Sequence, residues 1–221
     1  MTGLLDLETA FRATSQPGKI RVAAVILAAG SSRRMGGRHK LLLDIAGEPM
    51  IRRTVRNVLA STVGETVVVT GHRAEEVGRT LAGLAVRTVN NPHHEQGQPT
   101  SVVAGVRALS KPCDAVMVVL GDQPQVTPAD LDELIAAYGR LEGASILVPH
   151  YGGRRGNPVI FAARHIPGVL SGTVNVGCRH LIETHADEVA RVEMGSEAYT
   201  LDCDTPEDYE GLLLRLRGVP R

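Results

Sequence analysis

Four cations crowd into one short segment that is rich in glycine and serine. Arg33, Arg34, Arg38 and Lys40 follow a small-residue turn at Gly30, which ends an apolar run. Positive charges this close repel one another unless an anion lies among them. Glycine lets the backbone approach a ligand closely, and backbone N–H groups in such turns bind phosphate oxygens. The segment therefore predicts a polyphosphate site.

Two familiar phosphate-binding motifs do not account for this segment. The dinucleotide fingerprint G-x-G-x-x-G is absent, because Gly30 is followed by Ser-Ser-Arg-Arg-Met before Gly36. The P-loop requires Ser or Thr after Gly-Lys, whereas Lys40 stands between His39 and Leu41. Both motifs are also missing from the rest of the chain.

Carboxylates follow two later extended segments. Asp122 follows the apolar run 115–120 after one glycine, in Gly-Asp-Gln-Pro. A carboxylate there is costly unless it is paired or binds a cation, so Asp122 is a candidate Mg²⁺ ligand; the alternative is a residue that stabilises a turn. Asp202 and Asp204 form a D-x-D pair whose side chains would share one face of an extended segment. Which of the two lies nearer a metal stays open, and Asp204 could instead sit beside the start of the last helix.

Composition narrows the class of protein. The chain has 221 residues, a hydrophobic content of 43%, no tryptophan and a formal net charge of zero. A neutral chain gives no reason to expect nucleic-acid binding, and no apolar run is long enough to span a membrane. The dispersed Cys113, Cys178 and Cys203 favour a reducing compartment without structural disulfides or zinc. We expect a cytoplasmic protein whose residues 1–19 form an N-terminal extension and not a targeting signal.

Strands and helices alternate along the chain, which predicts a doubly wound α/β domain with a mainly parallel sheet and a late antiparallel excursion. The carboxyl ends of its strands would bring residues 28–40, 70–72 and 121–124 to one edge, where ligands bind in such sheets. We expect one domain over residues 20–221, with a nucleotide-binding half (20–143) and an acceptor-side half (144–221). The expected strands begin at Val22 and cover 66–70, 85–89, 115–120, 145–149, 158–162, 189–193 and 199–202; the expected helices cover 49–60, 74–81, 101–109, 178–184 and 205–217, and another is capped by Thr127.

The first segment resembles L-A-A-G-x-S-x-R-M-G…K-L, the signature loop of nucleotidyltransferases that attach a nucleoside monophosphate to a phosphorylated acceptor. Its arginine and lysine fall at Arg34 and Lys40. Asp122 falls in a G-D-x-P segment and residues 202–208 in D-x-D-T-P-E-D, both similar to later motifs of these enzymes. Over residues 20–217 the chain resembles the molybdenum cofactor cytidylyltransferase group of the MobA-like NTP transferase family. The resemblance implies a Rossmann-like three-layer α/β fold.

The resemblance also implies roles for particular residues. Arg34, Lys40 and Asp122 would be catalytic, and Asp122 would hold Mg²⁺ together with Asp202 and Asp204. The residues implied to bind the nucleotide are Leu27, Ala28, Ala29, Gly30, Ser32, Arg34, Lys40, Thr70, Gly71, Gly97, Ser101 and Asp122.

Two further segments resemble parts of the same family. Residues 91–101 are similar to N-P-x-x-x-x-G-x-x-x-S, and we expect the adjacent His93 and His94 within them to be solvated and not to bind a metal. Arg155, Asn157 and Pro158 resemble the acceptor-binding R-G-x-P motif, in which the family more often has histidine at position 157.

The expected reaction is transfer of CMP from CTP to the terminal phosphate of molybdenum-molybdopterin, with Mg²⁺ as cofactor and pyrophosphate as the second product. Leu-Ala-Ala-Gly at 27–30 favours cytidylyl transfer, because guanylyltransferases of the same cofactor have L-A-G-G. The expected partners are CTP, a molybdopterin-type acceptor and a client molybdoenzyme or its chaperone. The alternatives are another nucleotidyltransferase, acting on a sugar phosphate or other phosphorylated acceptor, and a non-catalytic chaperone that only binds the cofactor.

Overall fold

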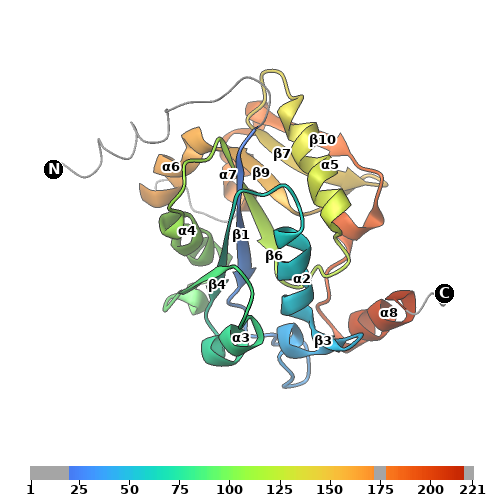
Figure 1. Ribbon diagram of the computed structural model, residues 1–221. Helices are drawn as coiled ribbons and strands as arrows, with labels where there is room; N and C mark the ends of the chain where they lie inside the picture. The colour runs from blue at the N-terminus through green and yellow to red at the C-terminus, as the bar shows by residue number, and fades with distance from the viewer. Residues whose placement is uncertain (1–19, 172–177, 217–221) are drawn as a thin grey trace.

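The computed structural model describes residues 20–171 and 178–216, so the expected extension at 1–19 lies outside the described residues. Strands and helices alternate along the chain, as expected (Figure 1). The strands are β1 (Val22–Ala28), β2 (Asp44–Ile45), β3 (Glu48–Pro49), β4 (Glu65–Thr70), β5 (Arg87–Asn90), β6 (Ala115–Leu120), β7 (Ile146–Tyr151), β8 (Arg154–Arg155), β9 (Val159–Ala162) and β10 (Val189–Glu193). The α-helices are α2 (Met50–Leu59), α3 (Ala74–Thr80), α4 (Gln98–Ala108), α5 (Pro128–Gly139), α6 (Ile166–Ser171), α7 (Cys178–Thr184) and α8 (Pro206–Leu216), and the 3₁₀ helices are η1 (Lys40–Leu42), η2 (His94–Gln96), η3 (Ala163–His165), η4 (Ala186–Glu188) and η5 (Glu197–Thr200).

The main sheet has the strand order β10-β7-β9-β6-β1-β4-β5, and β8 adds to β7. The central strand β1 is parallel to both β4 and β6, and β4 is parallel to β5. Strand β9 is antiparallel to β6 and to β7, whereas β10 is parallel to β7. The sheet is therefore mainly parallel with a late antiparallel excursion, which confirms the expected fold class.

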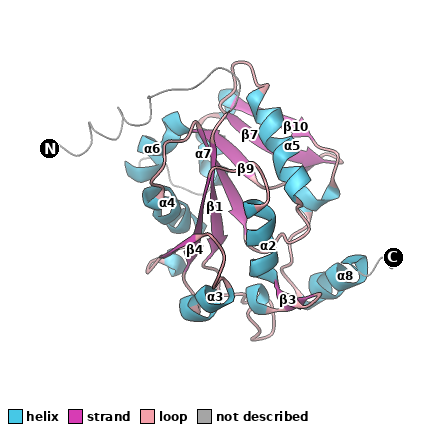
Figure 2. Ribbon diagram, in the orientation of Figure 1, coloured by secondary structure: helices cyan, strands magenta, loops and turns pink. Residues whose placement is uncertain are grey.

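Helices cover both faces of this sheet, giving three layers (Figure 2). Alternate residues of β1 point to opposite faces: Ala24 and Ile26 join one buried cluster, and Ala23 and Val25 the other. The first cluster includes apolar side chains of α2 and α5, and the second includes those of α4, α6 and α7. A buried parallel sheet of this kind explains why β1 is an unbroken apolar run.

Two helix starts illustrate how the local sequence sets the elements. The Thr127 side chain accepts a hydrogen bond from the backbone N–H of Asp130, whose carboxylate accepts from the Thr127 backbone, so the predicted cap of α5 is confirmed as a capping box. Helix α4 begins at Gln98, three residues before the expected start, with Pro99 in its first turn. Proline is tolerated there because the first backbone N–H groups of a helix have no intrahelical partner.

The strand expected at 199–202 is wrong. Residues 197–200 form the 3₁₀ helix η5, in which the Ser196 hydroxyl accepts from the Ala198 N–H at 3.2 Å. Tyr199 is fully buried, and its hydroxyl donates to the carbonyl oxygen of Asp130 at 2.5 Å. Apolar alternation in this segment therefore reflects a buried tyrosine anchor and not a strand.

Among the described residues, no helix combines the length and the apolar character that a membrane crossing requires.

Candidate active site

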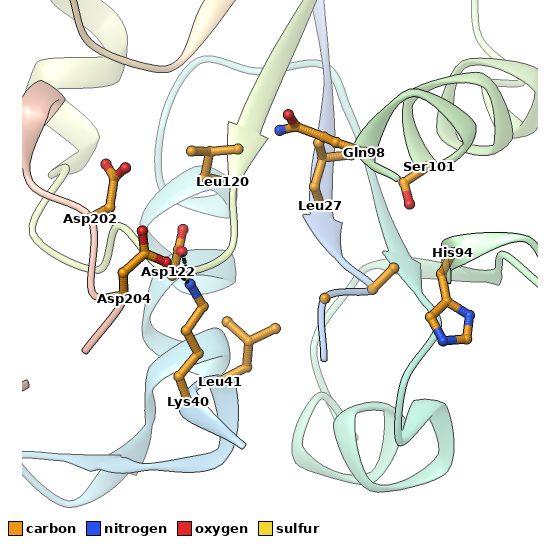
Figure 3. A pocket seen from close by; sticks show the side chains of 12 residues that line it. Leu27, Lys40, Leu41, His94, Gln98, Ser101, Leu120, Asp122, Asp202 and Asp204 are labelled. Atoms are coloured by element: carbon orange, nitrogen blue, oxygen red, sulfur yellow. Dashed lines mark hydrogen bonds and ion pairs between the residues drawn. The ribbon is translucent and has the colours of Figure 1, made fainter. Parts of the chain in front are cut away.

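A cleft of about 270 Å³ lies at the carboxyl edge of the parallel strands (Figure 3). The segments that follow β1, β5 and β6 meet there, together with η1, α4 and the residues before α8. This is the edge at which the sequence placed the polar segments. The lining residues are Leu27, Ala29, Gly30, Lys40, Leu41, His94, Gln98, Ser101, Leu120, Asp122, Asp202 and Asp204.

Close backbone contacts hold the strand ends together under the cleft. The N–H of Gly121 donates to the Leu27 carbonyl at 3.0 Å, and the N–H of His72 donates to the Ala29 carbonyl at 3.2 Å. A Cβ atom at position 121 would lie 2.8 Å from the Leu27 carbonyl oxygen, closer than real contacts allow. Glycine before Asp122 is therefore what brings this carboxylate against the end of β1.

Cations and acids pair at one end of the cleft. The ammonium of Lys40 contacts Asp122 and lies 2.7 Å from Asp204 Oδ1, and the Lys40 and Asp122 side chains are only 14% and 13% exposed. The guanidinium of Arg34 lies 2.7 Å from the second oxygen of Asp204. Lys40 is oriented locally as well, because its backbone N–H donates to Ser32 Oγ at 3.1 Å. The predicted catalytic residues Arg34, Lys40 and Asp122 thus share one ion-pair network.

The network shifts the pKa values of its members. Burial by itself would lower the pKa of Lys40, but Asp122 and Asp204 outweigh it and raise that pKa above the usual value. Burial would raise the pKa of Asp204, yet the hydrogen bonds and charges of Lys40 and Arg34 hold it below the usual range. Lys40 and Asp204 are therefore both charged at neutral pH.

Asp202 is the acid with the least compensation. Part of its surface is open to solvent, but desolvation of the carboxyl group and the charges of Asp122 and Asp204 raise its pKa. Its Oδ1 accepts a hydrogen bond from the side-chain amide of Gln123 at 2.9 Å, which partly offsets the rise. A carboxylate crowded by other carboxylates attracts an additional cation.

The acids fit magnesium in donor type. The carboxylates of Asp122, Asp202 and Asp204 line the same cleft, and carboxylate oxygens are ligands that Mg²⁺ prefers. Within 20–171 and 178–216, however, no three or more His, Cys, Asp or Glu side chains are grouped so as to hold a metal ion by themselves. Because Lys40 lies between Asp122 and Asp204, the donor set suits a cation that shares its shell with phosphate oxygens and water, as Mg²⁺ does in nucleotide sites.

A rigid polar loop forms the other end of the cleft. Asn91 is 2% exposed, and its side-chain amide donates to Thr100 Oγ1 at 2.8 Å and to Ser101 Oγ at 3.0 Å. Its backbone N–H donates to the Thr70 carbonyl at 2.8 Å, which ties the loop to β4. The Asn residue of the 91–101 segment therefore fixes Ser101 in place and is not itself a lining residue.

The residues expected to bind nucleotide fall into two groups. Those that line the cleft are Leu27, Ala29, Gly30, Lys40, Ser101 and Asp122. Those that support it without lining it are Ala28, Ser32, Arg34, Thr70, Gly71 and Gly97. Ala28 is fully buried in the core, Thr70 donates to the Val89 carbonyl at 3.3 Å, and Gly97 precedes α4 with a φ of 107°.

The acceptor-side residues lie beside a second hollow of about 230 Å³ that shares Asp122 and Asp202 with the cleft. Arg154 lines this hollow, whereas the expected Arg155 is exposed on β8 outside its lining. The backbone N–H of Asn157 donates to the Tyr199 carbonyl at 2.8 Å, and Pro158 is buried. These two residues therefore shape the loop, and the positive charges in the lining of the hollow come from Arg154 and Arg215.

Four lining residues were not expected: Leu41, His94, Gln98 and Leu120. Leu41 and Leu120 could have been predicted, because in the sequence they are close neighbours of Lys40 and Asp122. His94 was expected to be solvated like His93; that expectation is wrong for His94, which is half-buried in the cleft wall, whereas His93 is exposed. No pattern in the sequence separates the two histidines, because the turn of η2 decides which of them faces inward.

The chain is similar in sequence to known proteins. Residues 24–189 match the family model of the MobA-like NTP transferase domain. The chain is 30% identical over 204 residues to the purine catabolism protein PucB of Bacillus subtilis, covering 84% of this chain and 93% of that protein. It is 28% identical over 204 residues to the nicotine blue oxidoreductase of Paenarthrobacter nicotinovorans, covering 87% and 96%. A 45% identity to the bifunctional IPC transferase and DIPP synthase of Rubrobacter xylanophilus extends over 106 residues, 46% of this chain and only 24% of that protein.

Solved structures agree with this assignment. A nucleotidyl transferase from Methanothermobacter thermautotroptrophicus superposes with a TM-score of 0.77 at 28% identity, covering 91% of this chain and all 100% of the other. The fold is also that of a 4-diphosphocytidyl-2C-methyl-D-erythritol synthase from Anaerococcus prevotii, with a TM-score of 0.73 at 17% identity, covering 90% and 96%. With three quarters of the sequence inside the family match, the chain belongs to the MobA-like NTP transferase family and is a nucleotidyltransferase with a Rossmann-like fold.

Proposed function

We propose that the protein transfers CMP from CTP to the terminal phosphate of molybdenum-molybdopterin and releases pyrophosphate. The single observation that carries the proposal is the ion-pair network at the carboxyl edge of the sheet, in which Lys40 pairs with Asp122 and Asp204 and Arg34 pairs with Asp204, beside the third aspartate of the cleft, Asp202. Phosphoryl and nucleotidyl transfer depend mainly on positioning and charge neutralisation, which is what such a network supplies.

The chemistry requires no general base on the protein. An oxygen of the acceptor phosphate forms a bond to the α-phosphorus of CTP, and the bond from that phosphorus to the bridging oxygen breaks in line. Pyrophosphate leaves with the electron pair of the broken bond. Because the attacking phosphate is already an anion, no proton has to be removed from it. Lys40 and Arg34 would donate hydrogen bonds to phosphate oxygens and neutralise the charge that develops on the leaving group.

The proposal includes Mg²⁺, held by Asp122 with Asp202 or Asp204. When bound, Mg²⁺ would neutralise charge on the triphosphate and on departing pyrophosphate. Lys40 would then exchange its carboxylate partners for phosphate oxygens, so in the free protein its ammonium group already lies where the triphosphate would bind. The expected cytoplasmic location and the molybdoenzyme client stay predictions.

The cytidine and molybdopterin assignments are supported by the Leu-Ala-Ala-Gly sequence of the first turn and by the similarity of the later motifs. A relative that matches over most of its length is named an oxidoreductase. This chain lacks a G-x-G-x-x-G dinucleotide fingerprint and instead has paired cations and acids, which favours nucleotidyl transfer over hydride transfer.

The test is pyrophosphate release from CTP, GTP, UTP and ATP, each with molybdenum-molybdopterin or with a panel of sugar phosphates. We expect turnover with CTP and molybdenum-molybdopterin. Asp122→Asn should reduce this rate by at least about 100-fold, since it removes charge at the reacting end of the cleft. Asp187→Asn is the matched control, because Asp187 is an exposed acid of η4 outside the cleft, and its rate should equal that of the wild type.

Other outcomes would replace the proposal. Clear preference for GTP or UTP would assign a different nucleotide, and turnover with sugar phosphates alone would assign a different acceptor. Binding of molybdopterin without pyrophosphate release from any nucleotide would identify a cofactor chaperone. An Asp122→Asn variant with full activity would remove this aspartate from the mechanism.

A further inference from the structure

His94 occupies the wall of the cleft at the end away from the ion pairs. Figure 3 shows its ring with Ser101 and Gln98 on one side of the cleft, and Lys40 and Asp122 on the other. Its position depends on a glycine: a Cβ atom at Gly71 would lie 2.7 Å from both Cβ and Cγ of His94. Gly71, expected to bind nucleotide, therefore acts by letting this imidazole close against the end of β4.

The hydrogen bonds around His94 determine which ring nitrogen carries the proton. Nδ1 lies 3.2 Å from the carbonyl oxygen of Asn91. A carbonyl oxygen can only accept, so Nδ1 carries the hydrogen and donates it. A neutral imidazole has a single N–H, which leaves Nε2 with a lone pair and makes it an acceptor. The described residues give Nε2 no hydrogen-bond partner.

The carbonyl that sets this tautomer is itself immobile. The Asn91 side chain is held by Thr100 and Ser101 on one side, and its Oδ1 accepts from the His93 N–H at 2.9 Å on the other. The amide nitrogen and the oxygen of the Asn91 side chain therefore both have hydrogen-bond partners, which hold the loop in place. The acceptor character of His94 Nε2 is thus preset before any ligand binds.

Two neighbouring imidazoles line up behind His94. The rings of His72 and His94 are 6.4 Å apart and tilted by 49°, and those of His39 and His72 are 5.6 Å apart and nearly parallel at 2°. His39 is 4% exposed with neither ring nitrogen bonded, and burial lowers its pKa. Within the part of the chain that the structure describes, no three or more His, Cys, Asp or Glu side chains are grouped so as to hold a metal ion. The two neighbouring rings form an aromatic backing for the wall.

We propose that His94 reads the nucleobase: its Nε2 accepts a hydrogen bond from an exocyclic amino group, so the cleft selects a base with an amino group over one with an oxo group at the same position. Cytosine carries such an amino donor at C4, where uracil presents a carbonyl acceptor. With uracil, two lone pairs face each other and Nε2 loses its only partner. This inference rests on the proposed function in that the base of a nucleoside triphosphate must lie at this end of the cleft.

The size of the effect follows from the burial. Leaving one acceptor unsatisfied in a half-buried site, with a second acceptor opposite, reduces affinity on the order of 10- to 100-fold. Ser101 adds little discrimination, because its hydroxyl can rotate to donate or accept. His94, whose Nε2 can only accept, is therefore the residue expected to set the preference for CTP over UTP.

The experiment compares dissociation constants of CTP and UTP by calorimetry, with Mg²⁺ present and no acceptor. We expect the wild type to bind CTP about 10- to 100-fold more tightly than UTP. His94→Phe keeps an aromatic ring but removes the acceptor, so the CTP/UTP ratio should fall to within about threefold, chiefly through weaker CTP binding. His93→Phe changes the exposed neighbour in the same loop and should leave the ratio of the wild type unchanged.

A second probe needs no variant and covers the case in which His94→Phe does not fold. The triphosphate of 2-pyrimidinone riboside has neither an amino nor an oxo group at C4, so it should bind the wild type with affinity between those of CTP and UTP. Equal affinities for all three nucleotides, or a full CTP preference in a folded His94→Phe variant, would overturn the assignment.

These outcomes separate the inference from the proposed function. Amino-selective nucleotide binding without pyrophosphate release in the presence of molybdenum-molybdopterin would sink the proposed reaction and keep the role of His94. Pyrophosphate release with an unchanged CTP preference in His94→Phe would keep the reaction and sink the inference. No measurable binding of either nucleotide would overturn both.

Discussion

Lys40 is the residue whose removal tests the electrostatics of the cleft most directly. Its side chain is only 14% exposed and contacts both Asp122 and Asp204. Lys40→Met keeps a long side chain but leaves two carboxylates without the cation between them. We expect the variant to fold with reduced stability, because uncompensated charges in a half-buried site are costly.

The expected loss can be bounded from the geometry. At an effective dielectric constant of about 20, two unit charges about 4 Å apart interact by about 4 kcal/mol. Desolvation offsets part of this attraction, so breaking a fully buried pair costs about 3–5 kcal/mol and breaking an exposed pair about 0–1 kcal/mol. The Lys40 pairs lie between these limits, and we expect a loss of about 2 kcal/mol. In a chain of this size, that corresponds to a fall in Tm of about 4–8 °C.

The assay is thermal unfolding in metal-free buffer at neutral pH and near pH 4.5. In the wild type, Lys40 and Arg34 lower the pKa of Asp204, so its contribution is complete above about pH 4 and is lost as the pH falls further. Without Lys40, crowded carboxylates take up protons at higher pH, so acidification should narrow the difference in Tm between the two proteins. Added Mg²⁺ should raise the Tm of Lys40→Met more than that of the wild type.

The matched control is Lys111→Met, which removes an exposed ammonium outside the cleft. Its Tm should equal that of the wild type. If the Tm of Lys40→Met at neutral pH lies within about 1 °C of the wild-type Tm, the expected shift is absent. The ion pairs then contribute nothing to stability, and the electrostatic reasoning is wrong. A difference in Tm that does not respond to pH would show that lost packing, and not charge, is the cause.

Three further predictions concern the fold and are measured by urea unfolding. Gly105→Ala places a Cβ atom 2.2 Å from Val25 Cγ1 and should lower the free energy of unfolding by about 1–3 kcal/mol. Gly78→Ala, with nothing within 4 Å of its Cβ atom, should leave the free energy of unfolding unchanged or raise it by up to about 1 kcal/mol. Equal effects of the two substitutions would refute the close contact of α4 with the sheet. Burial lowers the pKa of His165 below its unfolded value of 6.5, so its contribution to stability should be complete above that pH and fall as the pH drops below it. His165→Phe should flatten this part of the profile of stability against pH, and an unchanged slope would contradict the prediction. Thr127→Ala should cost about 1 kcal/mol because it removes the side-chain half of a capping box, and a loss near zero would mean that the cap is redundant.

The fold was largely predictable because its signals are local. The buried strands β1, β4 and β6 are apolar runs whose polar neighbours mark their ends, and strand β10 and helix α7 have the expected bounds. Errors arose where a tertiary contact overrides the pattern. The segment around Tyr199 alternates between apolar and polar residues like a strand. The hydrogen bond from the Tyr199 hydroxyl to Asp130 and the one from Asn157 to the Tyr199 carbonyl hold it instead in a 3₁₀ turn.

The candidate site was predictable in its charged half and less so in its uncharged half. Lys40 and Asp122 lie in segments that follow parallel strands, so the rule for parallel sheets brings them to one edge, whereas Asp204 was expected from the D-x-D pair and the family resemblance. The inward turn of His94 depends instead on the missing side chain of Gly71, which follows β4 in a different part of the chain. A contact of this kind leaves no trace in the spacing of residues along one segment.

The reversed strand β9 has a consequence for how proteins with this architecture can diversify. Because β7 ends at the edge of the sheet where the cleft lies, the exposed turn at Gly152 and Gly153, which joins β7 to β8, projects there while β7 and β9 stay embedded in the sheet. Chain can be inserted into or deleted from that tip without disturbing the strands below it. On the proposed function, a lineage could thus change the acceptor that it uses by remodelling this turn, while the residues proposed to bind the triphosphate stay the same.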